Sequence, residues 1–554
     1  MNLDRGQFKL GCYQIPAWQR RLSVKRGAWL AECSDRGAAM TGADRLCDVL
    51  LVNGIDVCFA NPGTSEMHFV AALDRKPQMR CVLGLFEGVA TGAADGYARM
   101  TGKPAATLLH TGPGLANGLA NLHNAKRARV PMVNIVGDHA SYHVKYDAPL
   151  TSDVEALAWP MSDWVRKAAG PADVGPAAEA AIMAARTMPG IATLILPADS
   201  AWGDVAGPAP AALAIPAPPQ QPGERLHEIA LAMGKHAGRV GIIVGGEAAY
   251  GAGLAAAGRV AAACDGLLLT EVLPGRVEHG RGKAQATRIP YPIDAALRTL
   301  AGLDLLILCG APEPVAFFAY PDKPSRLLPD GCAVMTLADR AEDKLAALQA
   351  LADELGAPSR LPIRPPQVLE PLPTGALTED AIAVIVAARL PEGAILAEEA
   401  LTSARRLFAL AADAAPHDYL MTTGGAIGIG LPLALGAAIA CPDRKVVNVQ
   451  ADGSGMYTLQ ALWSMAREQA DVLVIVCANR RYAILQTEMR NLGFNQIGDN
   501  ATRMLSLDQP ALDWVKLAEG MGVEAARAES CERLDDLARA ALSRRGPFLI
   551  EAVI

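Results

Sequence analysis

Residues 451–482 read ADGSGMYTLQALWSMAREQADVLVIVCANRRY, and this stretch predicts how the chain folds. It follows an apolar run at 445–450 and contains a second one at 472–477, both typical of buried strands. Between the two runs, residues 454–468 repeat apolar positions at helical spacing. The stretch therefore predicts one strand–helix–strand unit of a parallel sheet.

Asp452 and Asn479 each stand just beyond one of these expected strands. Open α/β sheets bind ligands at the carboxyl ends of their strands, so we expect both side chains at that edge. Carboxylate and amide oxygens are ligands that Mg²⁺ accepts in proteins. Gly453 and Ser454 open the helix, whose free N–H groups suit a diphosphate. The alternative is that Asp452 only caps the helix.

The same alternation of apolar runs and helical stretches covers most of the chain. Strands are expected over 81–86, 105–110, 131–138, 240–246 and 304–310, and helices over 87–100 and 114–128. Pro-rich segments at 207–224 and 357–375 indicate linkers.

We therefore predict an α/β protein of three domains, each a mainly parallel sheet flanked by helices. The expected domain ranges are 41–206, 225–356 and 376–554. They follow an N-terminal extension of residues 1–40, which is either ordered or disordered.

The composition favours a globular enzyme and gives no sign of a nucleic-acid partner. The 554 residues are 51% hydrophobic and carry a formal net charge of −7. The longest apolar stretch, 424–440, is short for a membrane span, and it predicts a buried helix with a glycine-rich entry. The 11 cysteines are widely spaced, as is typical of reduced core thiols. Because no continuous apolar stretch stands near the N-terminus, we expect a cytoplasmic protein.

Residues 451–479 resemble the diphosphate-binding motif of thiamine diphosphate (ThDP) enzymes, Gly-Asp-Gly followed by Asn, with Ala451 in place of the first glycine. The resemblance implies a metal held by Asp452, Asn479 and the backbone carbonyl of Arg481. Residues 84–104, GLFEGVATGAADGYARMTGKP, are similar to the family segment whose glutamate contacts the cofactor's aminopyrimidine, which implies that role for Glu87.

Residues 59–69, 108–118, 401–404 and 424–432 resemble benzoylformate decarboxylase and acetolactate synthase large subunits. The resemblance implies that Thr64 contacts the substrate carboxylate and that His110 relays protons. It further implies a pyrimidine-binding domain at 41–206, a central domain and a diphosphate-binding domain at 376–554. The cofactor contacts implied beside Glu87 are Asn117, Thr402, Gly425, Ile427, Gly453, Ser454 and Tyr482.

Histidines other than His110 are weaker candidates. The decarboxylase has a second active-site histidine, and His279 is the nearest candidate for it in this chain. His139 and His143 are four positions apart and could chelate a metal on a helix, but no third ligand is marked. We therefore expect no metal site at this pair.

The resemblance implies ThDP- and Mg²⁺-dependent, non-oxidative decarboxylation of a 2-oxo acid. The product is an aldehyde, or a 2-hydroxy ketone or acid formed by carboligation, which makes the protein a lyase or a transferase. It also implies a homodimer or homotetramer with active sites at subunit interfaces.

Three alternatives stay open at this point. The first is an FAD-containing acetolactate synthase or oxidase. Residues 240–253 of the middle domain are glycine-rich, but this does not distinguish an enzyme with FAD from one without it. We favour the absence of FAD. The second is a nicotinamide dinucleotide enzyme, because residues 110–118 and Asp138 imitate a Rossmann fingerprint with the wrong glycine spacing. The third is a non-catalytic relative, which the presence of Glu87 and Asp452 disfavours.

Overall fold

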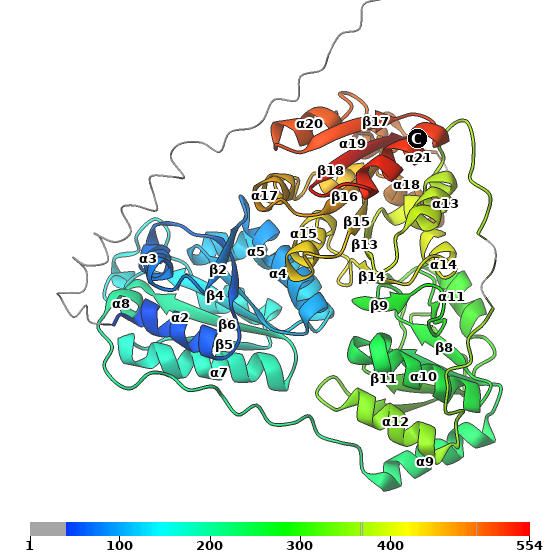
Figure 1. Ribbon diagram of the computed structural model, residues 1–554, viewed down its shortest axis with the longest axis horizontal. Coiled ribbons are helices and arrows are strands. Elements are labelled where there is room, and N and C mark those ends of the chain that lie inside the picture. The colour runs from blue at the N-terminus through cyan, green and yellow to red at the C-terminus, as the bar shows by residue number, and fades with distance from the viewer. Residues whose placement is uncertain (1–39, 366, 368, 495) are drawn as a thin grey trace, which may run out of the picture.

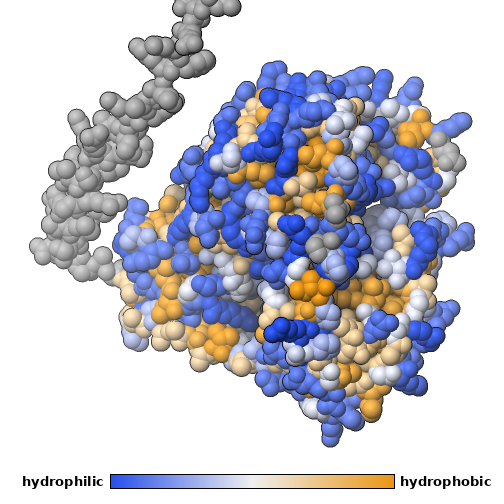
Figure 2. Space-filling model, turned by 45° about the vertical axis from the view of Figure 1, so that its right-hand side comes forward, coloured by the Kyte–Doolittle hydropathy of each residue, from blue (hydrophilic) through white to orange (hydrophobic). Residues whose placement is uncertain are grey.

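The computed structural model describes residues 40–365, 367, 369–494 and 496–554 and contains three mainly parallel sheets flanked by helices (Figure 1). This architecture confirms the predicted fold class. The expected N-terminal extension, residues 1–40, lies outside the described residues except for Met40. Figure 2 shows a largely hydrophilic face on which apolar residues form separate patches.

The first sheet is entirely parallel, with the strand order β2-β1-β3-β4-β6-β5. Its strands are β1 (Val57–Asn61), β2 (Arg80–Leu83), β3 (Ala105–Leu109), β4 (Met132–Asp138), β5 (Trp164–Lys167) and β6 (Ile191–Pro197). Its helices are α2 (Gly42–Val52), α3 (Met67–Arg75), α4 (Glu87–Thr101), α5 (Thr111–Arg127), α6 (Val154–Ala158), α7 (Val174–Thr187) and α8 (Ala198–Trp202). Residues 208–222 then form no helix or strand, as expected of a linker.

The second sheet is smaller and has the order β10-β8-β7-β11-β12. Its strands are β7 (Val240–Val244), β8 (Leu267–Thr270), β10 (Thr287–Arg288), β11 (Leu305–Cys309) and β12 (Ala333–Ala338). Its helices are α9 (Gly223–Lys235), α10 (Gly251–Ala263), α11 (Ile293–Leu300) and α12 (Lys344–Glu354).

The third sheet has the order β17-β18-β16-β15-β13-β14-β9, in which only β9 (Arg276–His279) is antiparallel to its neighbour. One edge strand of this sheet, β9, therefore comes from residues 225–356, which we expected to form a separate middle domain. The other strands are β13 (Ile395–Glu399), β14 (His417–Met421), β15 (Val446–Ala451), β16 (Val472–Ala478), β17 (Glu524–Ala528) and β18 (Phe548–Val553). The helices are α13 (Glu379–Arg389), α14 (Leu407–Ala411), α15 (Gly430–Ala440), α16 (Asp452–Gly455), α17 (Ala461–Glu468), α18 (Ala483–Asn491), α19 (Asp499–Leu505), α20 (Trp514–Gly520) and α21 (Cys531–Leu542).

The helix expected over 454–468 is instead two helices, α16 and α17, separated by a turn. Gly453 and Gly455 weaken helix formation at the start of this segment. Thr458, in the turn, donates its hydroxyl hydrogen to the carbonyl of Gly428 over 2.7 Å. The turn therefore ties this segment to the loop that precedes α15.

Helices α4 and α15 join the first and third sheets. Almost every residue of both helices is buried, and a shared apolar core extends across them. A Cβ atom at Gly96 would collide with the backbone carbonyl of Leu433, and one at Gly436 would collide with that of Ala93. These glycines let the two helix backbones touch, which fixes how the two sheets lie relative to each other.

Arg99 adds a polar connection at the same junction. Its guanidinium pairs with Asp95 of α4 at 2.6 Å and donates to the carbonyls of Gly275 and Met421. Among the described residues, the structure contains no helix long and apolar enough to cross a membrane.

Candidate active site

The carboxyl edge of the third sheet gathers the predicted metal and diphosphate residues. Four neighbouring parallel strands, β16, β15, β13 and β14, end at this edge. The residues that follow them are Asn479, Arg481 and Tyr482 after β16, Asp452, Gly453 and Ser454 after β15, Thr402 after β13, and Gly425 and Ile427 after β14. The structure thus brings together residues that lie up to 80 positions apart in the sequence.

Asp452 is a buried carboxylate whose partners are backbone N–H groups. Its Oδ1 accepts from Gly453 over 2.8 Å and its Oδ2 accepts from Arg480 over 2.6 Å. Burial raises the pKa of Asp452 to about 6, although these backbone hydrogen bonds and the charge of Arg480 lower it in part. A buried carboxylate held mainly by backbone N–H groups fits a bound metal ion.

The segment after β16 folds around this carboxylate. Asn479 Oδ1 accepts a hydrogen bond from the N–H of Arg481 over 3.1 Å, and Arg480 has a left-handed φ of 56°. The ring of Tyr482 lies against Gly453, where a Cβ atom would be 2.6 Å from it. Within the described chain, no cluster of three or more His, Cys, Asp or Glu side chains is arranged for a metal. The Asp452 carboxylate and the Asn479 amide oxygen, with the Arg481 carbonyl that the resemblance implies, would be a set of oxygen donors suited to Mg²⁺.

Glu399 holds the loop that carries Gly425 and Ile427. Its buried carboxylate accepts hydrogen bonds from the backbone N–H groups of residues 428, 429 and 430 at 2.8–3.1 Å. Gln450 donates to the same carboxylate over 2.8 Å. Gly425 has a left-handed φ of 79°, and a Cβ atom there would collide with the ring of Phe317. Glu399 was not among the predicted site residues, although its place at the end of an apolar run in the sequence was a usable signal.

Glu87 lies at the carboxyl edge of the first sheet and begins α4. Its side chain is buried, and Asn117 donates to its Oε2 over 3.0 Å. A Cβ atom on Gly114 would lie 3.1 Å from Glu87 Oε1 and 3.3 Å from His110 Cβ. Glu87, Asn117 and His110 therefore meet around a position where only glycine fits without displacement.

His110 is held by the buried carboxylate of Glu66, which was not among the predicted site residues. Its Nδ1 lies 2.8 Å from Glu66 Oε2 and 3.1 Å from Ser65 Oγ. Glu66 also accepts from the N–H of Gly63 over 2.8 Å, and it is 3% exposed. Glu66 therefore engages the Nδ1 side of the ring, and Nε2 is left for other partners.

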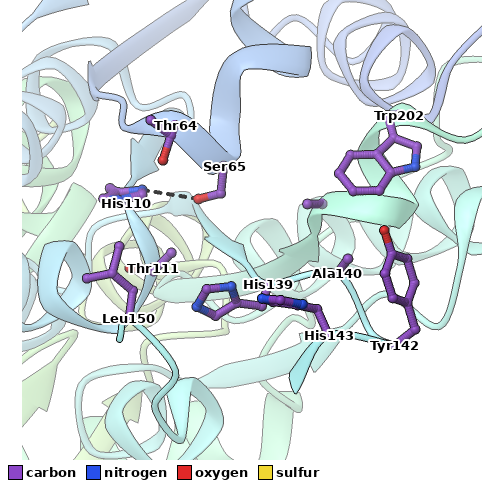
Figure 3. A pocket seen from close by; sticks show the side chains of 11 residues that line it. Thr64, Ser65, His110, Thr111, His139, Ala140, Tyr142, His143, Leu150 and Trp202 are labelled. Carbon is purple, nitrogen blue, oxygen red and sulfur yellow. Dashed lines mark hydrogen bonds between the residues drawn. The ribbon is translucent and has the colours of Figure 1, made fainter. Parts of the chain in front are cut away.

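A pocket of about 260 Å³ opens beside His110 (Figure 3). Thr64, at the start of a single 3₁₀ turn (Thr64–Glu66), lines it together with Ser65. His139 and His143 line it too, with ring centroids 5.7 Å apart, in a loop rather than on the helix considered for them.

His279 does not line this pocket. It lies on β9, where its Nε2 bonds to the carbonyl of Phe408 over 2.8 Å and its ring stacks on that phenyl ring. Burial lowers the pKa of His279 to about 3. A buried, neutral, stacked histidine has a structural role, so His279 is not the second active-site histidine of this chain's His110 pocket.

The two carboxyl edges adjoin each other within one chain. Asn121 Nδ2 donates to the carbonyls of Gly88, over 2.7 Å, and Gly428, over 3.4 Å. Asn124 exchanges two hydrogen bonds with the backbone of Ala426. Helix α5 therefore connects the start of the Glu87 helix to the loop that carries Gly425 and Ile427.

The glycine loops after β7 and β11 touch each other, because a Cβ atom at Gly310 would collide with the carbonyl of Gly245 and would lie 2.6 Å from Lys344 Cδ. The Lys344 ammonium group is 2.9 Å from a carboxylate oxygen of Glu247. Arg129 donates to the carbonyl of Gly310 at the same place. Beside these contacts lies a second pocket of about 480 Å³, which is lined in part by Arg129, Gly246, Glu247 and Gly310.

Two family models match the chain. The thiamine pyrophosphate enzyme N-terminal TPP-binding domain matches residues 40–158, and the C-terminal TPP-binding domain matches residues 403–552.

Curated relatives match over nearly the whole chain. "Putative acetolactate synthase large subunit IlvX" of Mycobacterium tuberculosis is 50% identical over 93% of this chain and 99% of its own length. Benzoylformate decarboxylase of Pseudomonas aeruginosa is 30% identical over 91% of this chain and 97% of its own length.

A solved structure shares the fold. The thiamine diphosphate-dependent 4-hydroxybenzoylformate decarboxylase of Rhodococcus jostii RHA1 superposes with a TM-score of 0.82 at 24% identity, covering 92% of this chain and 98% of that one. The chain belongs to the thiamine diphosphate-dependent enzymes related to acetolactate synthase and benzoylformate decarboxylase.

Proposed function

We propose that the protein catalyses the non-oxidative decarboxylation of a 2-oxo acid with ThDP and Mg²⁺. The observation that carries this proposal is a pair of buried acids at separate sheet edges, Glu87 bound by Asn117 and Asp452 bound by backbone N–H groups. In the proposal, residues 41–206 bind the pyrimidine end of the cofactor and residues 376–554 bind its diphosphate, with residues 225–356 as a central domain.

Mg²⁺ would be held by the Asp452 carboxylate, the Asn479 amide oxygen and the Arg481 carbonyl. The burial of the Asp452 carboxylate supports this assignment, because a divalent ion offsets the cost of burying it. Thr402, Gly453, Ser454 and Tyr482 would surround the diphosphate. Backbone N–H groups at helix starts favour such an anion.

Glu87 would hold a hydrogen bond to a ring nitrogen of the aminopyrimidine. Its burial and its contact with Asn117 fix the carboxyl group in place. Asn117 and the Gly425 carbonyl would bind the same end of the cofactor, and Ile427 would support its bent shape. Bound ThDP supplies an electron sink for the electron pair left when CO₂ departs.

His110 would move protons between the substrate and the pocket. Glu66 holds the Nδ1 side of its ring, so Nε2 is the atom that exchanges a proton. Thr64 would contact the carboxylate that is lost. A proton donor beside the reacting carbon favours aldehyde release over carboligation, and the close relative named as an acetolactate synthase keeps carboligation as the second candidate.

The enzyme we propose works without FAD. The close contacts of the Gly310 loop with Gly245, Lys344 and Arg129 support this part of the proposal. A purified protein without flavin absorbance near 450 nm would agree with it, and stoichiometric bound flavin would contradict it.

We further propose a homodimer or homotetramer in which each active site combines two chains. The contacts of α5 with the 424–428 loop lie within one chain, so the assembly needs its own test. Mixing inactive Glu87→Gln and Asp452→Asn proteins should restore activity if the sites combine two chains. No recovery in verified mixed oligomers would mean that each site belongs to one chain.

The direct test of the reaction is a product assay. The protein, loaded with ThDP and Mg²⁺, is offered pyruvate, benzoylformate and a short dicarboxylic 2-oxo acid separately, with CO₂ release followed and products identified by proton NMR. Aldehyde as the main product supports the proposal. Acetolactate from pyruvate as the main product would favour the second candidate, and no CO₂ from any of the three acids would contradict both.

A further inference from the structure

The pocket beside His110 holds hydrogen-bonding groups that the proposed proton transfer does not use. Thr111 and His139 both line it. The Thr111 hydroxyl and His139 Nε2 are buried atoms that have no hydrogen-bond partner within the described part of the chain. Thr111 is only 1% exposed. Buried polar atoms almost always have a partner, so each of these two needs one that the described residues do not supply.

Thr111 also has an unusual backbone conformation. Its φ is 49°, in the left-handed region that a β-branched residue rarely adopts. Such conformations cost free energy and concentrate at ligand-binding positions, where the surroundings enforce them. The backbone strain and the unpartnered hydroxyl therefore coincide at one residue of the pocket wall.

The pocket lining offers hydrogen-bond donors and contains no acidic side chain. The acids nearby are already engaged. Glu66 is bound by His110 and the N–H of Gly63, and Asp138 pairs with Lys167 at 2.5 Å. An acceptor with negative charge would consequently find donors and no opposing carboxylate.

The size and layout of the pocket restrict the ligand further. About 260 Å³ lies just below the roughly 300–1,000 Å³ of pockets that hold drug-sized molecules, so the ligand is small. Figure 3 shows His110 and Ser65 on one side and the rings of His139 and His143 beside each other on another, with Tyr142 and Trp202 away from His110. A short molecule could contact both His110 and the histidine pair.

We propose that His139, His143 and Thr111 bind a second carboxylate of the substrate, at the end opposite the carboxylate that is lost. This inference rests on the proposed function, because it takes His110 to lie beside the reacting carbon. The substrate class is then a short dicarboxylic 2-oxo acid. Neutral imidazole N–H groups and the Thr111 hydroxyl suffice as donors to the carboxylate oxygens.

The test uses two acids of equal length, 2-oxopentanedioate and 2-oxopentanoate, which differ only in the terminal carboxylate. We expect the wild type to prefer the dicarboxylic acid at least tenfold in kcat/KM. His139→Phe and His143→Phe should each reduce this preference roughly ten- to hundredfold, the loss expected for a hydrogen bond to a charged group. His227→Phe, at an exposed histidine of α9, is the matched control and should keep the preference.

Calorimetry separates this inference from the proposed reaction. The ThDP-free protein should bind 2-oxopentanedioate, and His139→Phe, checked for folding by circular dichroism, should not. Binding of 2-oxopentanedioate, without its decarboxylation by the protein loaded with ThDP and Mg²⁺, would support the pocket assignment and contradict the proposed function. Equal turnover of both acids, a preference that survives both substitutions, or no dicarboxylate binding with or without ThDP would overturn the inference.

Discussion

The first and third sheets have the same strand order but different chemistry at their edges. Numbered from its own first strand, each sheet runs 2-1-3-4-6-5, and the third adds β9 beyond its second strand. After strands 1, 2, 3 and 4 the first sheet has Thr64, Glu87, His110 and His139, whereas the third has Thr402, Gly425, Asp452 and Asn479. The topology thus determines where functional groups lie, and the residues at those places determine what they do.

The helices show the same correspondence. Helix α4 follows the second strand of the first sheet, and α15 follows the second strand of the third sheet. These two equivalent helices are the ones that pack against each other through Gly96 and Gly436. The two sheets therefore meet through the same part of each, with proton-handling groups proposed on one edge and metal-binding groups on the other.

The largest expected effect separates the two edges. Glu87→Gln should lower kcat by roughly 10²–10⁴-fold, because the amide cannot exchange the proton that the carboxyl group handles. Mg²⁺ affinity, measured by calorimetry, should stay unchanged because Asp452 is untouched. Glu519→Gln, at an exposed site, is the control. Wild-type-like turnover in Glu87→Gln would show that the first edge does not carry the proton chemistry.

The converse substitution tests the third sheet. Asp452→Asn should weaken Mg²⁺ binding by roughly 10–100-fold or more. Removing a residue that only hydrogen-bonds to a metal ligand already costs this much, and Asp452 would contact the metal itself. The measurement is a calorimetric Mg²⁺ titration in the presence of ThDP, with exposed Asp353→Asn as the control. Unchanged affinity would place the metal elsewhere.

The contact between the equivalent helices can be broken directly. Gly96→Ala inserts a methyl group against the carbonyl of Leu433 and should cost about 1–3 kcal/mol of unfolding free energy. Gly234→Ala in α9 meets nothing within 4 Å and should instead stabilise the protein by roughly 0.5–1 kcal/mol. Thermal and denaturant unfolding measure both. Similar effects of the two substitutions would mean that the helix contact is looser than described.

Glu66 allows a finer test of the first edge. Glu66→Gln should lower kcat about tenfold with little change in KM, because His110 loses a charged partner for its Nδ1 hydrogen. Steady-state kinetics of Glu66→Gln, His110→Ala and the double variant form the cycle. If Glu66 acts through His110, the double variant should be no slower than His110→Ala alone. Additive losses would show that Glu66 acts independently.

The smallest effect concerns pH at the third edge. Because burial raises the pKa of Asp452 to about 6, protons compete with Mg²⁺ below that pH. Half of the carboxyl groups are protonated at the pKa, so Mg²⁺ affinity should be about twofold weaker at pH 6 than at pH 7, and should fall further below pH 6. Calorimetric titrations at several pH values measure this. An affinity that is constant from pH 7 to pH 5 would contradict the assignment.

Strand ends were predictable from the sequence, and contacts between them were not. Asp452 and Asn479 directly follow strands because short apolar runs bounded by polar residues identify strands locally. Glu66 meets His110 only because β1 and β3 are neighbours in the sheet, and strand order is a property of the whole fold. No local pattern in residues 59–69 indicates that β1 lies beside β3.

The second sheet shows the same limit. The glycines after β7 and β11 are visible in the sequence, but the lysine that packs against Gly310 comes from α12. Similarly, His279 stood in a segment expected in the middle domain, and its strand pairs with β14 of the third sheet. In both places the contact is made with a distant segment, which the local sequence does not indicate.

Because the two sheets share a strand order but carry different functional groups, the groups of one sheet can change in evolution without changing those of the other. A substitution after a strand of the first sheet alters one set of groups, and the corresponding substitution in the third sheet alters another. If His139 contacts the substrate and Asp452 the metal, as proposed, substrate choice can change at the first sheet while the third sheet keeps its metal ligands. A lineage that carries both copies in one gene inherits this division of labour as a single unit.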